Sequence, residues 1–262
     1  MDNRSYLKKI IIDKVSGDDI QEVEDLTIEE ARLNVYLNGN KAISMMCIPI
    51  DQEAHAIGFL MSENVISSMD DVDEINISED GLRVDIKAKI VENSLENLYK
   101  EKTLVSGCGG GVTGNIAGQV EVPFNQTRFH VKPELISSEI KKFYQDSELY
   151  TLTGCVHKAM LYLEDGTTVT SEDIGRHNAI DKVVGKCKID NLDTAKSILF
   201  VSGRLSSEMV VKAVMHKVPI VVSRTAPTNL GVRTAHKHGL TLIGFARGKK
   251  MNIYTHSGRV IG

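Results

Sequence analysis

The second half of the chain repeats one pattern that leaves few fold classes open: a short apolar run, a loop, and a segment with helical spacing. The apolar runs are SILFV, PIVVS and LTLIGFA, and the helical segments include EDIGRHNAIDKVVGKC, RLSSEMVVKAVMHK and TNLGVRTAHKHG. Apolar strands that alternate with helices are typical of a largely parallel sheet covered on both faces. We therefore predict an α/β domain over residues 131–262.

The first part of the chain has a different pattern. Asn38 and Gly39 separate two β-rich runs, which is a strong hairpin signal. Asp51 is a candidate N-cap for the helix that follows it. We predict a smaller α+β domain over residues 1–105, in which residues 1–26 are a polar, loosely ordered arm. Between the two domains, residues 106–130 are predicted to be a linker with a Gly-rich loop.

Composition excludes several classes of protein. The chain has 262 residues and a net charge of -4, whereas a general nucleic-acid binder would carry a basic excess. Neither a membrane-spanning apolar run nor a convincing signal peptide is present in the sequence. The four cysteines are too scattered to suggest a disulfide framework: Cys47, Cys108, Cys155 and Cys187. We expect a cytoplasmic protein with reduced thiols that binds neither nucleic acid nor membrane.

Cationic residues follow the predicted strands, at the edge where open α/β sheets bind ligands. They occur in four places: Arg204 after the first strand, Arg224 and Thr225 after the second, Arg247 to Lys250 after the third, and Arg176 with His177 at a helix start. Cations in the first turn of a helix oppose its dipole unless an anion is near. The pattern favours a phosphorylated ligand. The alternative is that each cation is a solvated loop charge.

Cys108 stands in the glycine-rich stretch LVSGCGGGVTG. Two interpretations compete: the stretch is a flexible connector with an incidental cysteine, or it presents a thiolate to chemistry. Backbone N–H groups and nearby cations could lower the pKa of such a thiol. The sequence lacks a C-x-x-C dithiol, a zinc deaminase motif and a Cys/His ligand cluster, so we expect no metal. A lone thiolate suits covalent carriage of an acyl group or of a persulfide sulfur.

The remaining cysteines and histidines divide into structural and candidate functional residues. Cys47 is predicted to be a core residue and Cys187 to be incidental. His157, two residues after Cys155, could act on a thiol or bind phosphate, although a structural role is an open alternative. His177 has the stronger functional claim. The acidic pair before Arg176, Glu172 and Asp173, is predicted to cap that helix or to pair with the arginine.

Several motifs resemble those of the FdhD family, the formate dehydrogenase accessory sulfurtransferases. They are EDIGRHNAIDKVVG at 172–185, SGRLSSEMVVKA at 202–213, TAPTNLGV at 225–232 and LTLIGFARGKKMNIYT at 240–255, with weaker matches in TGCVHKAM and IGFLMSEN. The resemblance extends from about residue 28 to the end of the chain. It implies a C-terminal three-layer α/β domain similar to cytidine deaminase without its zinc ligands, after a smaller N-terminal α+β domain.

The resemblance also implies a function. Family members take persulfide sulfur from a cysteine desulfurase and pass it to the bis-molybdopterin guanine dinucleotide cofactor of formate dehydrogenase. On this chain, the catalytic residue would be Cys108. The residues implied for the cofactor, which GDP would mimic in part, are Phe245, Ala246, Arg247, Gly248, Lys249 and Lys250, together with the strand-end residues Arg204, Arg224 and Thr225. His157, Arg176, His177 and Cys155 would support them, and the family forms homodimers.

Two departures from the family pattern affect the expected mechanism. The second cysteine of the family's loop is replaced by Gly111, which excludes a relay of sulfur within the loop but not carriage on Cys108. Cys155 stands where the family has a glycine and is a candidate stand-in thiol. A rival interpretation is a nucleotide-binding chaperone that delivers the cofactor without sulfur chemistry. Nucleotide hydrolysis is a weaker rival, because the sequence has no P-loop.

Overall fold

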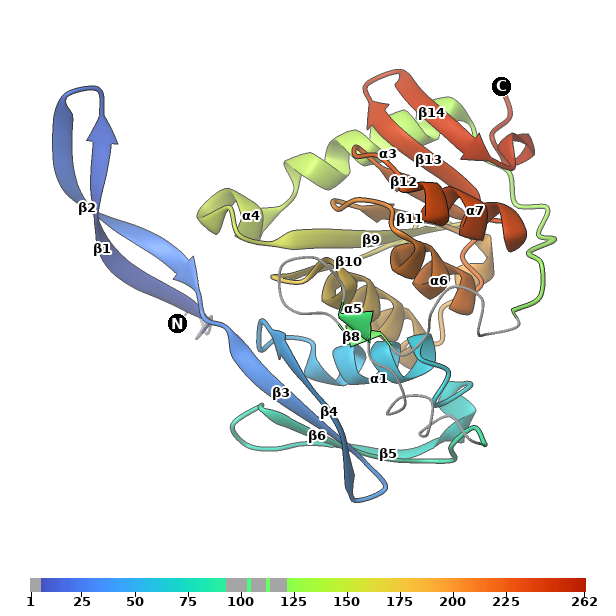
Figure 1. Ribbon diagram of the computed structural model, residues 1–262, viewed down its shortest axis with the longest axis horizontal. Coiled ribbons are helices and arrows are strands. Elements are labelled where there is room, and N and C mark those ends of the chain that lie inside the picture. The colour runs from blue at the N-terminus through green and yellow to red at the C-terminus, as the bar shows by residue number, and fades with distance from the viewer. Residues whose placement is uncertain (1–5, 93–102, 105–111, 114–121) are drawn as a thin grey trace.

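The computed structural model describes residues 6–92, 103–104, 112–113 and 122–262, and Figure 1 shows their arrangement. They form a layered body from which one long hairpin projects. The body contains a four-stranded and a six-stranded sheet, and a short antiparallel pair lies beside it, formed by β7 (Thr103–Leu104) and β8 (Val112–Thr113). Within the described residues, no helix is long and apolar enough to cross a membrane.

The projecting hairpin consists of β1 (Leu7–Ser16) and β2 (Asp19–Ile28), which pair antiparallel along their whole length. The turn between them uses Gly17 at φ 63°, a conformation that glycine adopts without cost. The prediction of a loosely ordered arm over residues 1–26 is therefore wrong from Leu7 onward. Both faces of the hairpin mix charged and aliphatic side chains, so the alternation that marks a strand was hidden.

The four-stranded sheet has the order β4-β3-β6-β5. Its strands are β3 (Ala31–Leu37), β4 (Asn40–Cys47), β5 (Val72–Ile77) and β6 (Arg83–Ala88), with a 3-10 turn at Met69–Asp71. Asn38 and Gly39 turn the chain between β3 and β4 with φ of 50° and 81°, which confirms the predicted hairpin. Helix α1 (Gln52–Ser62) covers one face of this sheet and is buried from Ala54 to its end.

The six-stranded sheet has the order β10-β9-β11-β12-β13-β14. Its strands are β9 (His157–Leu163), β10 (Thr168–Asp173), β11 (Ser197–Val201), β12 (Ile220–Ser223), β13 (Thr241–Arg247) and β14 (Lys250–Thr255). Only the central trio, β11 to β13, is parallel; the other strands pair antiparallel to their neighbours. The expectation of a largely parallel sheet is thus corrected to a mixed sheet with a parallel centre.

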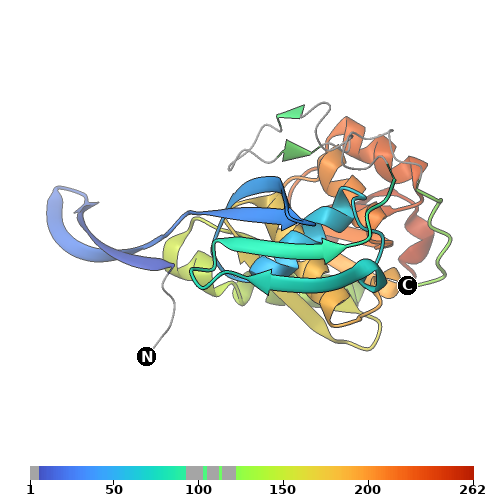
Figure 2. The same cartoon turned by 90° about the horizontal axis from the view of Figure 1, so that it is seen from below.

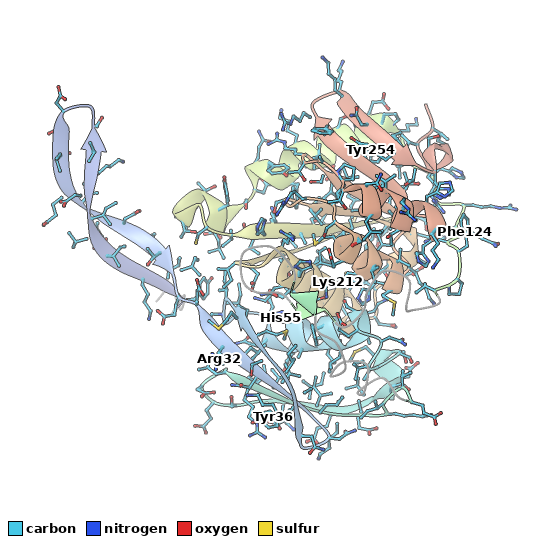
Figure 3. All side chains as sticks on the ribbon, viewed as in Figure 1. Arg32, Tyr36, His55, Phe124, Lys212 and Tyr254 are labelled. Atoms are coloured by element: carbon cyan, nitrogen blue, oxygen red, sulfur yellow. The ribbon has the colours of Figure 1, made fainter. Side chains whose placement is uncertain are left out.

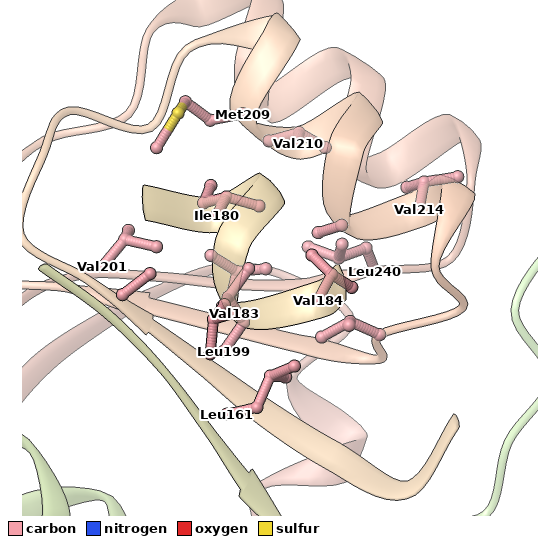
Figure 4. Close-up of a cluster of buried hydrophobic side chains, with 14 of the residues drawn as sticks. Leu161, Ile180, Val183, Val184, Leu199, Val201, Met209, Val210, Val214 and Leu240 are labelled. Atoms are coloured by element: carbon pink, nitrogen blue, oxygen red, sulfur yellow. The ribbon is translucent and has the colours of Figure 1, made fainter. Parts of the chain in front are cut away.

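Helices cover both faces of the six-stranded sheet, which gives the expected three-layer α/β arrangement. On one face lies α3 (Pro133–Gln145), followed by the short α4 (Glu148–Thr153). On the other lie α5 (Arg176–Ile189), α6 (Ser207–Met215) and α7 (Asn229–Lys237), whose apolar side chains meet those of the strands in Figure 4. A 3-10 turn leads into β11 at Thr194–Lys196, and another follows β14 at Ser257–Arg259.

Two glycines allow α1 and α5 to pack with almost no space between their backbones. A Cβ atom on Gly58 of α1 would lie 1.9 Å from the carbonyl oxygen of Asp181, and one on Gly185 of α5 would lie 1.8 Å from that of Ala54. Asp51, the predicted N-cap of α1, makes no side-chain cap and instead pairs with Lys186 of α5 at 2.6 Å. The two sheets therefore belong to one packed body, joined through α1 and α5 (Figure 1).

Candidate functional site

The carboxyl edge of the parallel trio is where four segments of the chain meet. β11 and β12 end side by side at Val201 and Ser223. Because β9 runs antiparallel to β11, its first residue, His157, lies at the same edge, and His157 is paired with Asp173, the last residue of β10. The loops that follow β10, β11 and β12 carry the predicted cations, so the topology places these loops together.

The loops after β11 and β12 are fastened to each other by hydroxyl groups. Ser223 Oγ donates to the carbonyl oxygen of Gly203 at 2.9 Å, and Thr225 Oγ1 donates to the same oxygen at 2.7 Å. The Thr225 amide in turn donates to Ser223 Oγ at 3.1 Å. The side chain of Thr225, a predicted ligand residue, therefore holds the loop that carries Arg204. Arg204 itself is exposed.

One group of site residues lies on the α5 side of this edge. The side chain of Arg176 packs over Gly203, where a Cβ would come within 3.0 Å of Arg176 Cδ. His157 Nδ1 lies 3.1 Å from Ser202 Oγ, and burial together with the charge of Arg176 lowers the pKa of His157. Burial first, then the charges of Lys212 and Arg176, lower the pKa of His177 to about 3. Both imidazoles are therefore neutral at pH 7.

His177 is the most unusual member of this group. Its Nε2 atom is buried and has no hydrogen-bond partner among the described residues. A buried imidazole nitrogen without a partner is destabilising, and such groups are often found where a ligand binds. His177 therefore stays the stronger candidate of the two, because the ring of His157 already contacts Ser202.

A second group lies on the α3 side. The guanidinium of Arg224 stacks on the ring of Tyr144 at 4.1 Å from its centroid, a favourable cation–π contact. Burial raises the pKa of Tyr144, and the charges of Arg224 and Arg247 oppose that rise. Arg224 and Arg247, which lie at the ends of different strands, thus both lie near Tyr144. The pattern of cationic strand ends could not have indicated this tyrosine, because it lies on the helix that packs across them.

The end of β13 is irregular in a way that exposes an aromatic ring. Phe245 has φ 52°, its side chain is 41% exposed, and its amide donates to the Thr225 carbonyl at 3.1 Å. The pairing of β13 with β14 shifts register between Gly244 and Arg247, so Phe245 sits in a bulge. A bulky residue at positive φ is strained, which is more common at functional positions than elsewhere. After it come the exposed Arg247, Gly248, Lys249 and Lys250, whereas the side chain of Ala246 is buried under α3.

A buried ion pair fixes the loop that leads into α5. Asp173 Oδ2 and Lys182 Nζ lie 2.6 Å apart, and both side chains are completely buried. The same carboxylate accepts from the amides of Ile48 and Gly175 and from Asn178 Nδ2, at 3.1, 3.0 and 2.8 Å. Lys182 Nζ also donates to the carbonyl oxygen of Ile48 at 2.9 Å. The residues after β4 are thus bonded to the loop that presents Arg176 and His177.

A second buried pair joins the helices behind this loop. Lys212 Nζ contacts both carboxylate oxygens of Asp181 at 2.8 and 2.9 Å, and Ser62 Oγ donates to Asp181 at 2.8 Å. Ser62 Oγ also lies 3.0 Å from His216 Nε2. Figure 3 shows Lys212 of α6 and His55 of α1 in the region between the two sheets. These polar contacts link α1, α5 and α6.

The acidic residues before Arg176 do not play the roles expected of them. Asp173 pairs with Lys182, and Glu172 bonds to Ser147 Oγ and accepts from the Leu149 amide at 3.2 Å. Glu172 therefore caps α4. The prediction that this acidic pair caps α5 or neutralises Arg176 is wrong: α5 has no side-chain cap, Asp173 forms its ion pair with Lys182, and Glu172 bonds to α4.

The comparison with known sequences decides the family. The sequence model described as the FdhD/NarQ family matches residues 28–261. The chain belongs to the FdhD/NarQ family. Its relatives include the sulfur carrier protein FdhD of Wolinella succinogenes, 54% identical over 97% of this chain and 90% of the relative, and that of Bacillus subtilis, 34% identical over 92% and 93%.

A solved structure agrees with this membership. The crystal structure of a protein from Desulfotalea psychrophila, assigned as a formate dehydrogenase accessory protein, is similar with a TM-score of 0.76 and 27% identity, over 97% of this chain and 98% of that chain. The family match begins at residue 28, where β2 ends. The projecting hairpin thus precedes the part of the chain that the FdhD/NarQ model matches.

The cysteines of this FdhD/NarQ member can now be compared with their predicted roles. Cys108 and Gly111 lie outside the described residues, so the role of Cys108 stays a prediction. Cys47 and Cys187 are buried, and burial raises the pKa of their thiols to about 11 and about 12, which makes them unreactive. Cys155 is exposed, and its Sγ lies 3.4 Å from Thr153 Oγ1. Among the described residues, no group of His, Cys, Asp and Glu could hold a metal ion.

Proposed function

We propose that this protein is a sulfur carrier for formate dehydrogenase: Cys108 accepts sulfur as a persulfide from a cysteine desulfurase and passes it to bis-molybdopterin guanine dinucleotide. The names of the relatives from W. succinogenes and B. subtilis support sulfur carriage, and the assignment of the D. psychrophila protein supports the link to formate dehydrogenase. In this proposal the protein is a cytoplasmic sulfurtransferase that works as a homodimer.

The observation that carries the proposal is the cationic carboxyl edge of the six-stranded sheet. Arg204, Arg247 and Lys250 are exposed there, and none forms an ion pair with a carboxylate of the described residues. Helix α6 begins at this edge without a side-chain cap, whereas Thr228 caps α7 through the Gly231 amide at 3.0 Å. Free backbone N–H groups and unpaired arginines suit the diphosphates of a guanine dinucleotide.

The two transfers can be written with balanced electrons. The Cys108 thiolate attacks the outer sulfur of the donor persulfide; a new S–S bond forms on Cys108, the donor's S–S bond breaks, and the donor cysteine leaves as a thiolate. In the second transfer an electron pair of the acceptor bonds to the outer sulfur, and Cys108 leaves as a thiolate. The neutral imidazoles of His157 and His177 add no positive charge to the edge, so anion binding there depends on the arginines and lysines.

Mass spectrometry after incubation with a cysteine desulfurase and cysteine tests the proposal. The wild-type protein should gain one sulfur atom, and Cys108→Ala should lose this gain. Cys155→Ser is the matched control, because it removes the exposed thiol near His157 and should keep the gain. A persulfide that forms on Cys108→Ala at the wild-type level would overturn the proposal. Loss of sulfur from Cys155→Ser alone would instead assign the carrier role to Cys155.

The rival function, a chaperone that binds the cofactor without sulfur chemistry, is favoured by the same cationic edge. The two functions differ in their need for a thiol. A cell that carries Cys108→Ala as its only copy should lack formate dehydrogenase activity if sulfur transfer is required. Normal activity in that cell, with GDP binding retained by the purified variant, would establish the chaperone instead.

A further inference from the structure

The hairpin of β1 and β2 has the features of a surface that another chain covers in the functional protein. It projects from the body in both Figure 1 and Figure 2, and among the described residues no further strand pairs with either of its edges. Four of its aliphatic side chains are strongly exposed: Ile10 at 42%, Ile11 at 63%, Val15 at 64% and Ile20 at 65%. A two-stranded ribbon is marginal alone in water, and free edges readily pair with other strands.

We infer that β1 pairs edge to edge, antiparallel, with β1 of a second copy of this chain, which forms a four-stranded sheet across a twofold axis. This inference deepens the proposed homodimer by naming its surface, and so it rests on that part of the proposed function.

The hydrogen bonding within the hairpin determines which groups of β1 point outward. The amide of Glu29 donates to the carbonyl oxygen of Tyr6 at 2.7 Å, and the pairing continues from Leu7 opposite Ile28 to Ser16 opposite Asp19. Antiparallel pairs alternate between hydrogen-bonded and non-hydrogen-bonded. The even-numbered residues of β1 therefore bond to β2. The odd-numbered residues, from Leu7 to Val15, direct their N–H and C=O groups to the free edge.

A twofold axis that pairs these free groups passes beside one residue of β1. Beside an even-numbered residue it would place like charges opposite each other, at Lys8 or Lys14, or a charged residue opposite an aliphatic one, at Ile10 or Ile12. At Lys9 or Asp13 it would place two like charges directly opposite each other, which is unfavourable. At Ile11 it places Ile11 against its own copy, Lys9 against Asp13 of the second copy, and Leu7 against Val15. This register matches apolar with apolar residues and makes two opposite-charge pairs. On the other sheet face it places Ile10 opposite Ile12. It also places Lys8 opposite Lys14, and this like-charge pair reduces the stability of the dimer.

The charges within the hairpin also favour a cation next to Asp13. Asp13 lies directly opposite Glu22 of β2, and neither has an ion-pair partner among the described residues. Lys9 already lies 2.8 Å from Glu24, but an ammonium group has three donors, so it can also bond to Asp13 of the second copy. The other edge does not offer this match, because the outward residues of β2 include both Glu22 and Glu24. A second β2 would therefore be repelled.

Charge exchange tests this interface by sedimentation equilibrium. The wild-type chain should be a dimer. Asp13→Lys should weaken it about tenfold or more, because two lysines then face each other at both charge pairs. The double variant Lys9→Asp with Asp13→Lys should restore the dimer, because it recreates the opposite-charge pairs in reverse. Glu22→Lys is the control: it makes the same charge change on β2 and should leave the dimer as strong as in the wild type.

Cross-linking gives an independent readout. In a hydrogen-bonded antiparallel pair the Cα atoms are about 5.5 Å apart, within the range of a disulfide. Ile11→Cys should therefore form a covalent dimer on mild oxidation, and Ile20→Cys, which is equally exposed on β2, should not. Equal cross-linking of the two variants, or a dimer that Asp13→Lys leaves intact, would overturn the inference while the proposed homodimer survives. A monomeric wild-type chain would overturn both, and sulfur transfer by that monomer would leave the carrier function standing.

Discussion

Charged residues are buried and paired at the α1–α5 interface, whereas at the carboxyl edge of the six-stranded sheet they are exposed and have no carboxylate partner among the described residues. At the interface, Asp173 with Lys182 and Asp181 with Lys212 are paired and buried. At the edge, Arg204 and Arg247 are exposed, and no carboxylate among the described residues neutralises them. Burying a charge is costly unless every group finds a partner, and leaving cations close together at a surface is unfavourable unless an anion binds.

The difference separates charges that stabilise the fold from charges that are free to bind the proposed ligand. The buried pairs fix the position of the β10–α5 loop and of three helices, and their partners are all within the chain. The exposed cations at the edge have no carboxylate partner among the described residues, and we propose that their partner is a bound anion. Because Asp173 ends β10 and Arg176 begins α5, the buried Asp173–Lys182 pair also fixes the position of Arg176 at the edge. The predictions below test this separation.

The largest effect is expected from Lys182→Met. The substitution leaves the buried carboxylate of Asp173 without its counter-ion, and breaking a buried pair in this way costs about 4 kcal/mol. Urea denaturation at pH 7 measures the loss. Lys196→Met is the matched control, because Lys196 pairs with Glu164 at 2.9 Å on the surface and its loss should be nearly neutral. Similar losses in the two variants would contradict the distinction between buried and exposed pairs.

The next effect is expected from Gly185→Ala. The added methyl group would meet the Ala54 carbonyl at 1.8 Å, so α1 and α5 must move apart. Overpacking of a close contact costs about 3 kcal/mol when the backbone has to shift. Gly258→Ala is the control, since a Cβ there meets nothing within 4 Å. If Gly185→Ala is as stable as Gly258→Ala in urea, the helices are not held as closely as described.

At the cationic edge, Arg247→Gln should weaken GDP binding about tenfold, because it removes a charge-assisted contact to phosphate. It should leave the urea midpoint unchanged, since the side chain is exposed. Arg32→Gln, an exposed arginine on the four-stranded sheet, should alter neither quantity. Isothermal titration calorimetry at low and high salt measures the affinity. Loss of stability without loss of affinity would place Arg247 among the structural charges.

The smallest effect per residue concerns pH. Burial lowers the pKa of His55, His177 and His216 to about 3. In the unfolded chain these residues take up a proton near pH 6.5, whereas in the folded chain they do so only near pH 3. The unfolded state therefore binds more protons between these values, and stability falls as the pH is lowered from 6.5 toward 3. At pH 5.5 the loss should be about 1 kcal/mol per histidine relative to pH 7.5.

Single substitutions show which histidine causes this pH dependence. His55→Leu should remove about a third of the histidine contribution, because it deletes a ring whose two nitrogens are buried without partners among the described residues. Ile57→Val, a change at a buried aliphatic residue of the same helix, should leave the pH dependence as it is in the wild type. Urea denaturation at pH 7.5 and 5.5 measures both, and an unchanged pH dependence in His55→Leu would show that this histidine can be protonated in the folded protein.

The sequence was informative where structure depends on local chemistry. The Asn38-Gly39 turn was predictable, because few other residues adopt two positive φ values in succession. The alternation of apolar runs with helices likewise predicted the three layers. The direction of β9 was not predictable, because a buried strand has the same composition whether it runs parallel or antiparallel. The hairpin of β1 and β2 was missed because its exposed faces lack a simple alternation.

The candidate site was predictable only in part. The cationic residues follow their strands in sequence, so the sheet topology alone brings them to one edge. Tyr144 and the buried Asp173–Lys182 pair could not be predicted, because their contacts join segments that are far apart. The bond from Lys182 to Ile48 spans 134 positions. Ala246 was included in a continuous ligand segment, but alternation along β13 turns its side chain into the core.

The contacts of Asp173 and Lys182 with Ile48 have a consequence for how the sequence of this fold can evolve. Both bonds reach the main chain of residue 48, not its side chain. Any amino acid except proline can supply the same N–H and C=O groups. Position 48 can therefore be substituted without a matching change at positions 173 or 182, and statistical coupling between aligned columns would not reveal that these positions touch.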